Sequence, residues 1–391
     1  MVDSSQKTDV FIIGGGPAGL AAAIAARQKG FHVILADGCA PPIEKSCGEG
    51  MLPETLAALQ AMGVEISSTE GWKFRGIRFV QERAQVSADF PQGSGIGLRR
   101  PLLHGRMVAK AEECGVRLLW KTPVAGVDAD GVHFSRGKLN ARWIVGADGL
   151  GSRVRRWSGL DPTRRSKQRY ASRRHYRVQP WSNYMEIHWG RYTQAYVTPM
   201  GGEEVCVVVM AESMEHTSFD TALSELPELR EHLAGAGLSS RERGAVTSIR
   251  SLCNVQRGNV ALVGDASGSV DPITGEGLRL SFQHAFELAD AMAGGDLMPY
   301  ERAHRALARS PMMMGDLLLW LGHNPRVRSH AIRALQSRPE LFGRWMAAHV
   351  GAANSAKLLT AGALVGWRLL WNWNCLAKSK RRNDPYIPRE F

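Results

Sequence analysis

The sequence predicts an α/β protein with three parts: a parallel strand–helix domain, an inserted antiparallel β-sheet domain and a helical C-terminal segment. Three observations carry this prediction. Residues 9–37 read as strand, glycine-rich turn, helix and strand, which is typical of a βαβ unit. Residues 170–249 contain several short β-branched runs around one helical stretch. The chain beyond Pro311 has helical periodicity.

Length and charge narrow the possible functions. A chain of 391 residues suggests two or three structural units. Its 44% hydrophobic and 22% charged residues exclude a disordered or fibrous protein. The net charge of +12 favours anionic partners, such as a dinucleotide, an acidic carrier or partner protein, or lipid headgroups. Nucleic acid is not an expected partner, because no nucleic-acid-binding pattern is present.

The cysteines and the apolar runs indicate the compartment. The six cysteines form no CxxC pair and no zinc spacing, so we expect no metal site. Without a secretory signal, this cysteine usage predicts a cytoplasmic protein. The apolar stretches 10–26 and 358–371 are too short or too interrupted to cross a bilayer. We therefore expect no transmembrane segment, while peripheral membrane contact stays open.

The first turn carries a Gly14-x-Gly16-x-x-Gly19 pattern. Gly14 suits a tight turn, Gly16 lets the backbone approach a pyrophosphate, and Gly19 lets helix and strand pack closely. Pro17 and Ala18 open the helix, whose free N–H groups favour phosphate.

Asp37 ends the second strand, 23 residues after Gly14, where a carboxylate can hold a ribose hydroxyl. Taken alone, Asp37 could be an ordinary turn acid. In this context we expect a Rossmann-type unit that binds FAD or NAD rather than NADP, because an acid disfavours a 2′-phosphate.

The rest of the sequence predicts further strands and helices and, from their order, three parts of the chain. We predict strands at 72–90 (a hairpin), 116–120, 123–127, 141–147, 184–189, 194–198, 205–210 and 259–263, and helices at 101–114, 220–233, 277–293 and, as a pair, 341–371. The predicted domains are a nucleotide-binding domain of residues 1–68, 94–165 and 253–310, a substrate-binding sheet domain of residues 69–93 and 166–252, and a helical segment of residues 311–391.

Two further motifs follow strands. The first is Ala147-Asp148-Gly149; the second is Gly264-Asp265-Ala266, followed by the turn 271–277. Together with the first turn they resemble the flavoprotein family of FAD-dependent monooxygenases, which includes aromatic-ring hydroxylases, geranylgeranyl reductases and flavin halogenases. The resemblance implies that FAD is the cofactor.

In that family, Asp148 and Gly149 would belong to the second fingerprint, and Asp265 would bind the ribityl chain. The turn with Pro272, Gly275 and Gly277 would face the flavin pyrimidine edge. The residues themselves agree with this placement, because Gly275 and Gly277 open a helix whose N–H groups can meet an anionic oxygen.

The resemblance also marks residues outside these motifs. Arg100 matches an arginine near the flavin phosphates, although its neighbour Arg99 is equally plausible by charge. Val124 would lie on a strand beside the adenine, and Cys47 and Gly48 would lie beside the isoalloxazine. Cys47 and Pro272 are therefore the candidates nearest the chemistry, and we identify no catalytic residue. An inert buried thiol is the alternative for Cys47.

Tyr196 and Pro199 are the predicted substrate-binding residues. The alternative for Tyr196 is core packing with a hydroxyl that is satisfied inside the protein. The segment 195–199 keeps the Tyr and Pro of the reductase branch's Tyr-x-Trp-x-Phe-Pro motif but lacks its Trp and Phe. Upstream, residues 153–177 contain ten Lys or Arg and one acid. This basic stretch is either a solvated face or a site that attracts a nicotinamide phosphate, a carrier protein or a phosphorylated substrate.

The resemblance implies an FAD-dependent oxidoreductase. The leading interpretation is an NAD(P)H-dependent monooxygenase, in which a flavin C4a-hydroperoxide attacks an aromatic or polyene small molecule. The alternatives are a reductase of an isoprenoid double bond and a flavoprotein that acts with a partner protein as a maturation factor. No second GxGxxG pattern exists, so a nicotinamide donor would dock transiently or a partner would supply electrons.

Overall fold

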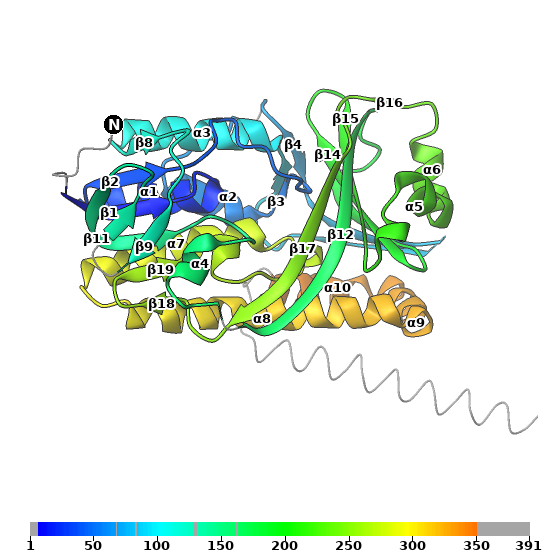
Figure 1. Ribbon diagram of the computed structural model, residues 1–391. Coiled ribbons are helices and arrows are strands. Elements are labelled where there is room, and N and C mark those ends of the chain that lie inside the picture. The colour runs from blue at the N-terminus through cyan, green and yellow to red at the C-terminus, as the bar shows by residue number, and fades with distance from the viewer. Residues whose placement is uncertain (1–6, 68, 83, 129–130, 162, 350–391) are drawn as a thin grey trace, which may run out of the picture.

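The computed structural model describes residues 7–349, apart from residues 68, 83, 129–130 and 162. Two large sheets lie at opposite ends of the molecule, and helices cover both (Figure 1). The predicted fold class is confirmed, because a largely parallel sheet with helices is followed by a largely antiparallel sheet and a helical C-terminal part.

The first sheet has a parallel core. Its apolar strands are buried, as expected for a parallel sheet covered on both faces. Helix α1 (Pro17–Gln28) is rich in alanine and almost wholly buried, so it packs closely on α3 (Arg100–Glu113) and α7 (Gly277–Ala293). In order, the strands are β18 (Gln256–Arg257), β19 (Val260–Leu262), β11 (Lys138–Gly146), β1 (Lys7–Ile13), β2 (Val33–Ala36) and β8 (Arg117–Leu119). Strand β10 (Gly131–His133) also pairs with β11, and β9 (Gly126–Asp128) pairs with β10.

The second sheet is mainly antiparallel and is buried on both faces. One face packs on the C-terminal helices, and the other packs on α5 (Phe219–Glu225) and α6 (Pro227–His232). In order, its strands are β16 (Gly237–Leu238), β12 (Thr163–Arg177), β15 (Glu204–Ala211), β14 (Thr193–Met200), β13 (Tyr184–Trp189), β5 (Gly76–Gln81) and β6 (Ala84–Asp89), with β17 (Arg243–Leu252) paired to β12.

Smaller elements complete the fold. A small sheet of β3 (Gly50–Met51), β7 (Gly95–Gly97) and β4 (Trp72–Phe74) lies between the large ones. The short helices are α2 (Pro53–Ala61), α4 (Arg153–Trp157), η1 (Met214–His216), η2 (Gly264–Ala266) and η3 (Pro272–Thr274).

Strands β12 and β17 connect the two ends of the molecule. They pair antiparallel from Thr163 opposite Leu252 to Arg173 opposite Arg243. Figure 1 shows them as a long ribbon that leaves the first sheet's side and crosses the second sheet. One face of β12 therefore runs past the space between the two sheets.

Several predicted elements differ from the observed ones. Residues 122–125 form a loop before β9, so Val124 does not lie on a strand. The predicted helix 220–233 is two helices, because Pro227 lacks the N–H that would continue α5. Helix α8 (Met298–His323) contains Pro311, so the predicted boundary between 310 and 311 falls inside a helix.

Helices α9 (Pro325–Gln336) and α10 (Pro339–His349) follow α8 and pack on the second sheet. The predicted helix pair at 341–371 lies mostly outside the described residues. Among the residues that the structure describes, no helix has the length and apolar character needed to cross a membrane.

Close packing at Gly19 predicts an effect on stability. A Cβ added there would lie 1.9 Å from the carbonyl oxygen of Gly14, so Gly19→Ala must displace α1 or the turn. We expect a loss of about 1–3 kcal/mol or more in the free energy of unfolding, measured by urea denaturation.

Gly105 is the matched control. It is an exposed glycine in the middle of α3, and an added Cβ would meet nothing within 4 Å. Gly105→Ala should stabilise the protein by about 0.5–1 kcal/mol. Equal effects of the two substitutions would contradict the close contact.

Candidate flavin site

A cavity of about 560 Å³ lies where the carboxyl ends of β1 and β2 face the second sheet. This volume is typical of small-molecule and cofactor sites. Every residue predicted to bind the cofactor lines the cavity, with the single exception of Gly19: Gly14, Gly16, Pro17, Ala18, Asp37, Cys47, Gly48, Arg100, Val124, Asp148, Gly149, Asp265, Pro272, Gly275 and Gly277.

Glycines form the side of the cavity that belongs to the first sheet. A Cβ built on Gly16, Gly48, Gly149 or Gly277 would meet nothing within 4 Å. The space beside these backbones is open, so a ligand can approach their N–H groups closely. Gly14 has a different role, because its φ of 114° and its contact with Ala147 require glycine. Gly19 is buried beneath the turn and acts through packing alone.

Asp37 lines the cavity with a carboxylate that is already oriented. Its Oδ2 accepts a hydrogen bond from the backbone N–H of Gly15 (2.6 Å), and its Oδ1 accepts one from Cys39 (2.7 Å). These two bonds fix the carboxylate at the end of β2, where its remaining lone pairs can accept hydrogen bonds from ribose hydroxyls.

The two other aspartates of the motifs have different surroundings. Asp148 supports α4, since its carboxylate accepts hydrogen bonds from Ser152 Oγ and from the N–H groups of Arg153 and Val154. Asp265 forms a salt bridge with Lys45 (2.6 Å), a residue of the segment before Cys47. Both carboxylates lie on the cavity wall.

The turn before α7 brings backbone N–H groups to the cavity. Asp271 accepts from the N–H of Ile273, and Gly275 has a left-handed φ of 68° that suits glycine. Helix α7 then begins at Gly277, so its positive dipole end lies at the cavity wall. An anionic ring edge would be stabilised at this position.

The structure distinguishes the two neighbouring arginines. Arg100, at the start of α3, lines the cavity. Arg99 turns toward the second sheet, where it pairs with Glu204 (2.6 Å) and contacts His175. Arg100 is therefore the arginine that can meet a phosphate.

Sequence reasoning missed His104, which supports the glycine turn from α3. Its Nε2 donates to the carbonyl of Gly15 (2.8 Å), and the side chain is fully buried. Burial lowers the pKa of His104, so the ring stays neutral and acts as a fixed donor. A lone histidine in a helix offers no sequence signal for this contact.

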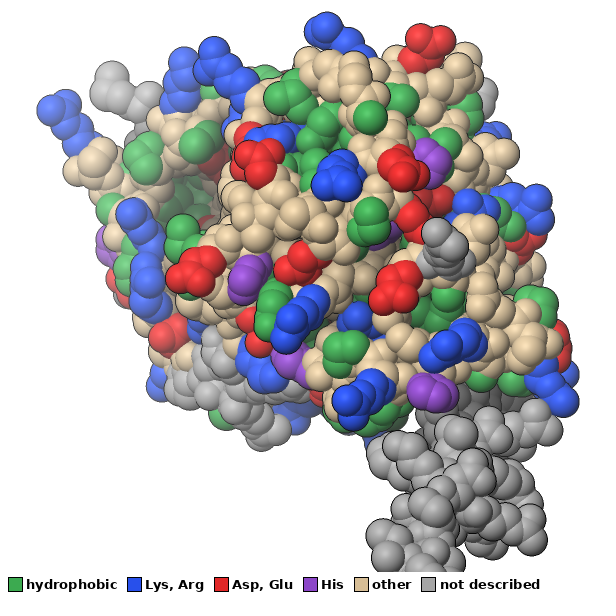
Figure 2. Space-filling view, turned by 90° about the vertical axis from the view of Figure 1, so that its right-hand side faces the viewer, with side chains coloured by type: hydrophobic (Ala, Val, Ile, Leu, Met, Phe, Trp, Pro, Cys, Tyr) green, Lys and Arg blue, Asp and Glu red, His purple; other side chains and the backbone are tan. Residues whose placement is uncertain are grey.

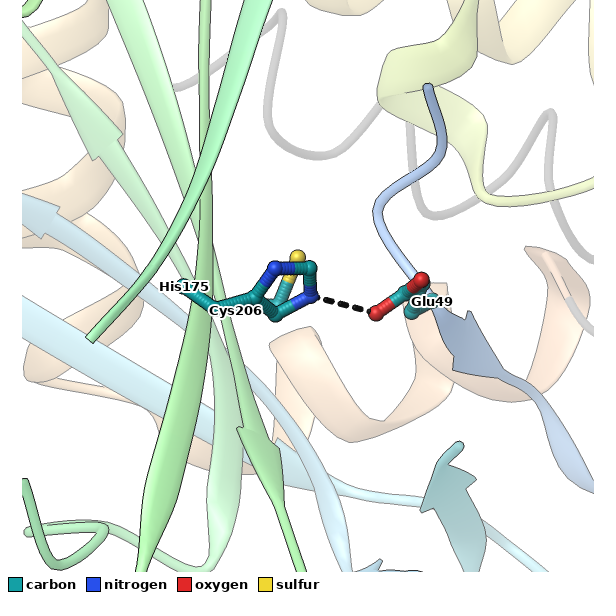
Figure 3. Close-up of side chains that lie close together, drawn as sticks. All are labelled: Glu49, His175 and Cys206. Atoms are coloured by element: carbon teal, nitrogen blue, oxygen red, sulfur yellow. Dashed lines mark hydrogen bonds and ion pairs between the residues drawn. The ribbon is translucent and has the colours of Figure 1, made fainter. Parts of the chain in front are cut away.

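Glu49 makes the main polar junction between the cavity loop and the second sheet. Its carboxylate accepts hydrogen bonds from Arg173 Nη1 (2.9 Å), His175 Nε2 (2.6 Å) and the backbone N–H of Arg100 (3.0 Å). Figure 3 shows His175 of β12 pointing at Glu49. Glu49 has a left-handed φ of 58°, which a residue other than glycine adopts only when its surroundings hold it there.

The charge state of Glu49 follows from these partners. Burial by itself would raise the pKa of Glu49, but the hydrogen bond and charge of His175, the N–H of Arg100 and the charge of Arg173 lower it below the ordinary 4.5. The carboxylate is therefore ionised at neutral pH. This stabilises the loop that carries Cys47 and Gly48.

Glu49, His175 and Cys206 also place their ligand atoms within 4.8 Å of one another. The arrangement does not suit a cation, because the guanidinium of Arg173 already occupies one carboxylate oxygen of Glu49. Burial raises the pKa of Cys206 well above 9.0, so its thiol stays protonated. The cluster is an ion-pair and hydrogen-bond network.

A second buried ion pair holds the turn before α7. Arg169 of β12 donates to Asp271 (2.8 Å) and to Gln194 Oε1 (2.7 Å). Tyr196 donates its phenol proton to the same Gln194 oxygen (3.3 Å). Burial raises the pKa of Tyr196, so the phenol remains protonated.

These contacts change the interpretation of the basic stretch 153–177. Arg155, Arg169 and Arg173 are buried and make salt bridges inside the protein, so this part of the stretch is not a solvated face. The end of the second sheet is mixed in charge as well, since Figure 2 shows basic and acidic side chains interspersed on it.

The wall of the cavity that belongs to the second sheet is mainly apolar, with Thr247 of β17 as a polar member. Ala171, Met185, Val208, Met210 and Val246 line it together with Tyr196. Pro199, the other predicted substrate residue, does not line the cavity, since its carbonyl packs against Gly97. The β-strand alternation explains the difference, because Tyr196 and Pro199 are three residues apart and so face opposite sides.

The fold and this cavity define a two-sheet protein with a nucleotide site at the end of a parallel sheet. The chain belongs to the FAD binding domain family, whose model matches residues 7–295. It is an FAD-dependent oxidoreductase.

Named relatives agree with the family. The chain is 26% identical over 341 residues to the menaquinone reductase of Mycolicibacterium smegmatis, covering 80% of this chain and 82% of that protein. It is 30% identical over 310 residues to digeranylgeranylglycerophospholipid reductase 1 of Methanopyrus kandleri, covering 70% and 77%. A flavoprotein/dehydrogenase from Cytophaga hutchinsonii has the same fold, with a TM-score of 0.81 at 16% identity over 94% of this chain and 100% of that one.

The groups that line the cavity suit FAD, independently of the comparisons with relatives. Open glycine backbones, an oriented acid at the end of β2 and a helix N-terminus are the groups that a dinucleotide with a ribityl-linked ring requires. Asp37 would hold the adenosine ribose, Gly16 and Arg100 the phosphates, and Asp265 the ribityl chain.

Asp37→Ala tests the ribose contact. Loss of hydrogen bonds to a charged acceptor, about 1.5–3 kcal/mol, should weaken FAD binding by about ten- to a hundredfold in calorimetry. Asp9 is the control, because its carboxylate accepts the N–H of His32 but does not line the cavity. An unchanged FAD affinity in Asp37→Ala, or an equal loss of FAD affinity in Asp9→Ala, would contradict the assignment of Asp37 to the ribose.

Glu49→Gln tests the junction with the second sheet. Removing the charge leaves the buried Arg173 with Glu44 (3.0 Å) as its remaining carboxylate partner, so we expect a loss of about 1.5–3 kcal/mol in unfolding free energy at neutral pH. Because the pKa of Glu49 is lowered on folding, its stabilisation is complete above 4.5 and is lost as the pH falls through the lower folded value.

The pH dependence of stability below 4.5 should therefore be shallower in Glu49→Gln than in the natural chain. Glu113, which forms an exposed pair with Lys110, is the control, and Glu113→Gln should change stability by about 1 kcal/mol or less. Identical acid profiles for the natural chain and Glu49→Gln would show that Glu49 is not the titrating group.

Proposed function

We propose that this oxidoreductase reduces a carbon–carbon double bond in a large, mainly apolar, isoprenoid-like substrate. The observation that carries the proposal is the apolar wall of Ala171, Met185, Val208, Met210 and Val246 opposite the glycine cradle. A hydrocarbon chain gains free energy from burial against such a wall, by about 25 cal/mol for each Å² removed from water.

The named relatives support the same class. Menaquinone and digeranylgeranyl lipids both carry isoprenoid chains, and the chain covers more than two thirds of each of these reductases. FAD, when bound and reduced by an electron donor, would supply the hydride equivalent for the reduction.

The protein's contribution is to bind the chain, orient it and exclude water. The strands β12, β14 and β15 form a rigid wall, because their other face packs in a second apolar core. Tyr196 is held by Gln194 and lies near Arg169, so its ring presents an apolar surface with an internally satisfied hydroxyl. Cys47 lies on the opposite loop and lines the cavity.

Monooxygenation is the second candidate. It is favoured by the segment 195–199, which lacks the Trp and Phe of the reductase motif. Both reactions require a reduced flavin, and we propose NADH or NADPH as the electron donor, docking transiently because the sequence holds one GxGxxG pattern.

An anaerobic single-turnover experiment separates the two reactions. FAD-loaded protein is reduced with dithionite and mixed, without oxygen, with a geranylgeranyl phospholipid, which has no quinone ring that could accept the electrons instead. We expect the flavin absorbance of the oxidised state to return and the lipid to gain two hydrogens by mass spectrometry. Reoxidation that needs oxygen, with one oxygen atom in the product, would replace the reductase proposal with monooxygenation.

Val246→Glu tests the apolar wall. Val246 lines the cavity and is 48% exposed, so a charge there is tolerated by the fold but disfavours a hydrocarbon. The KM for the lipid should rise about tenfold or more. Leu238→Glu is the matched control, because Leu238 is also 48% exposed on the second sheet but does not line the cavity. Equal kinetics in both variants would place the substrate elsewhere.

A further inference from the structure

A second cavity of about 260 Å³ adjoins the flavin cavity behind the turn before α7. It lies between α7, α8 and the end of β17. Asp265, Gly277 and Ser281 line both cavities, so a single layer of protein separates them. None of the motifs of the flavin site explains the residues deeper in this second cavity.

Two buried histidines lie in its wall. His284 of α7 is 4% exposed, and neither of its ring nitrogens meets the geometry of a hydrogen bond with any described residue. His304 of α8 stacks on it, with ring centroids 4.0 Å apart, and His304 Nε2 contacts Ser267 Oγ (2.9 Å). A buried polar side chain without a partner is rare in folded proteins and points to a ligand or water in the cavity.

The two imidazoles are neutral. Burial lowers the pKa of His284 well below its ordinary value, with His304 and Arg279 adding to the effect, and burial lowers the pKa of His304 to about 4. Each ring therefore offers one N–H donor and one acceptor nitrogen. Neither ring nitrogen of His284 has a hydrogen bond within the geometric limits among the described residues, although the ring lies close to the backbone of His304.

Three arginines lie at the mouth of the cavity. Arg305 pairs with Glu301 (2.5 Å) and Arg250 lies 4.0 Å from Asp161, whereas Arg309 has no salt bridge among the described residues. Arg305 and Arg309 are exposed on successive turns of α8, and Arg250 lies opposite them on β17. The Nη2 of Arg305 donates to the carbonyl of Cys253 (2.7 Å), which holds its guanidinium beside the cavity. The acid in the lining, Asp265, is neutralised by Lys45. An anionic group would be stabilised at this mouth.

The rest of the lining is apolar. Leu252, Val255, Val270, Leu280 and Met312 surround the space beside the histidines. The cavity is therefore amphiphilic, with arginines outside, apolar side chains inside and an unpartnered imidazole between them.

We propose that this cavity is a second binding site, for a small anion with an apolar body. The carboxylate or phosphate head would bind Arg305 and Arg309, and the apolar body would lie against Leu252 and Val270, with a polar atom at His284. Because Asp265 and Gly277 line both cavities, the occupant changes the surroundings of the flavin and acts as an effector of it.

Titration of the FAD-loaded protein with benzoate and with phenyl phosphate tests the proposal. The two probes share the ring and differ in the anionic head, so the tighter one identifies the head that the site prefers. We expect saturable heat in calorimetry and a shift of the bound flavin's absorption spectrum. No substrate turnover is needed, so failure of this site and failure of the proposed reaction are separate results.

Variants locate the bound probe. Arg309→Ala and Arg305→Ala change exposed side chains and should each weaken binding about tenfold or more. Arg302→Ala is the matched control, because Arg302 is exposed on the same helix but does not line the cavity, and its affinity should be unchanged. His284→Phe removes both ring nitrogens and should also weaken binding.

Three results would overturn the proposal. The first is the absence of saturable binding of both probes. The second is an affinity for the probe that is the same in Arg305→Ala and in Arg309→Ala as in the unsubstituted protein. The third is that Val246→Glu, in the flavin cavity, weakens binding of the probe while Arg309→Ala does not. The probe would then occupy the flavin cavity. A change in the ¹⁵N chemical shift of the His284 ring on adding probe confirms contact if His284→Phe does not fold.

Discussion

The structure depends on the pairing of two buried arginines of one strand with two buried carboxylates from the flavin loops. Arg169 and Arg173 lie four residues apart on β12, so both face the same side of the sheet, with Ala171 between them. Arg169 holds Asp271 of the turn before α7, and Arg173 holds Glu49 of the Cys47–Gly48 loop. One strand face thus fixes both loops that border the proposed position of the flavin ring.

This pairing explains the placement of other residues. Transfer of four charges from water is unfavourable, so each ion needs further hydrogen bonds. Glu49 obtains them from His175 and the N–H of Arg100, and Asp271 obtains one from Ile273. The same bond from Arg100 to Glu49 joins the start of α3 to the loop, which leaves the Arg100 side chain on the cavity wall. Buried ion pairs contribute little net stability, and here their main effect is to position the loops.

The two sides of the flavin cavity have different physical origins. The side from the first sheet is made of backbone, because Gly16, Gly48, Gly149 and Gly277 leave space for close approach. The side from the second sheet is made of apolar side chains on a rigid sheet.

The sequence alone determined the parts of the protein that depend on local backbone geometry. The glycine turn at 14–19, the acid at the end of β2 and the start of α7 at Gly277 were all predictable, because each is a short segment whose glycines or strand end impose one conformation. Only the tertiary structure decided which long polar side chains meet across the two sheets. It turned Arg99 away from the cavity and Arg100 toward it, buried Arg169 and Arg173, and excluded Pro199 from the wall. It also left the ring nitrogens of His284 without a well-formed hydrogen bond to any residue that the structure describes. These outcomes depend on contacts between residues more than a hundred positions apart, such as Arg173 with Glu49, and no local pattern encodes them.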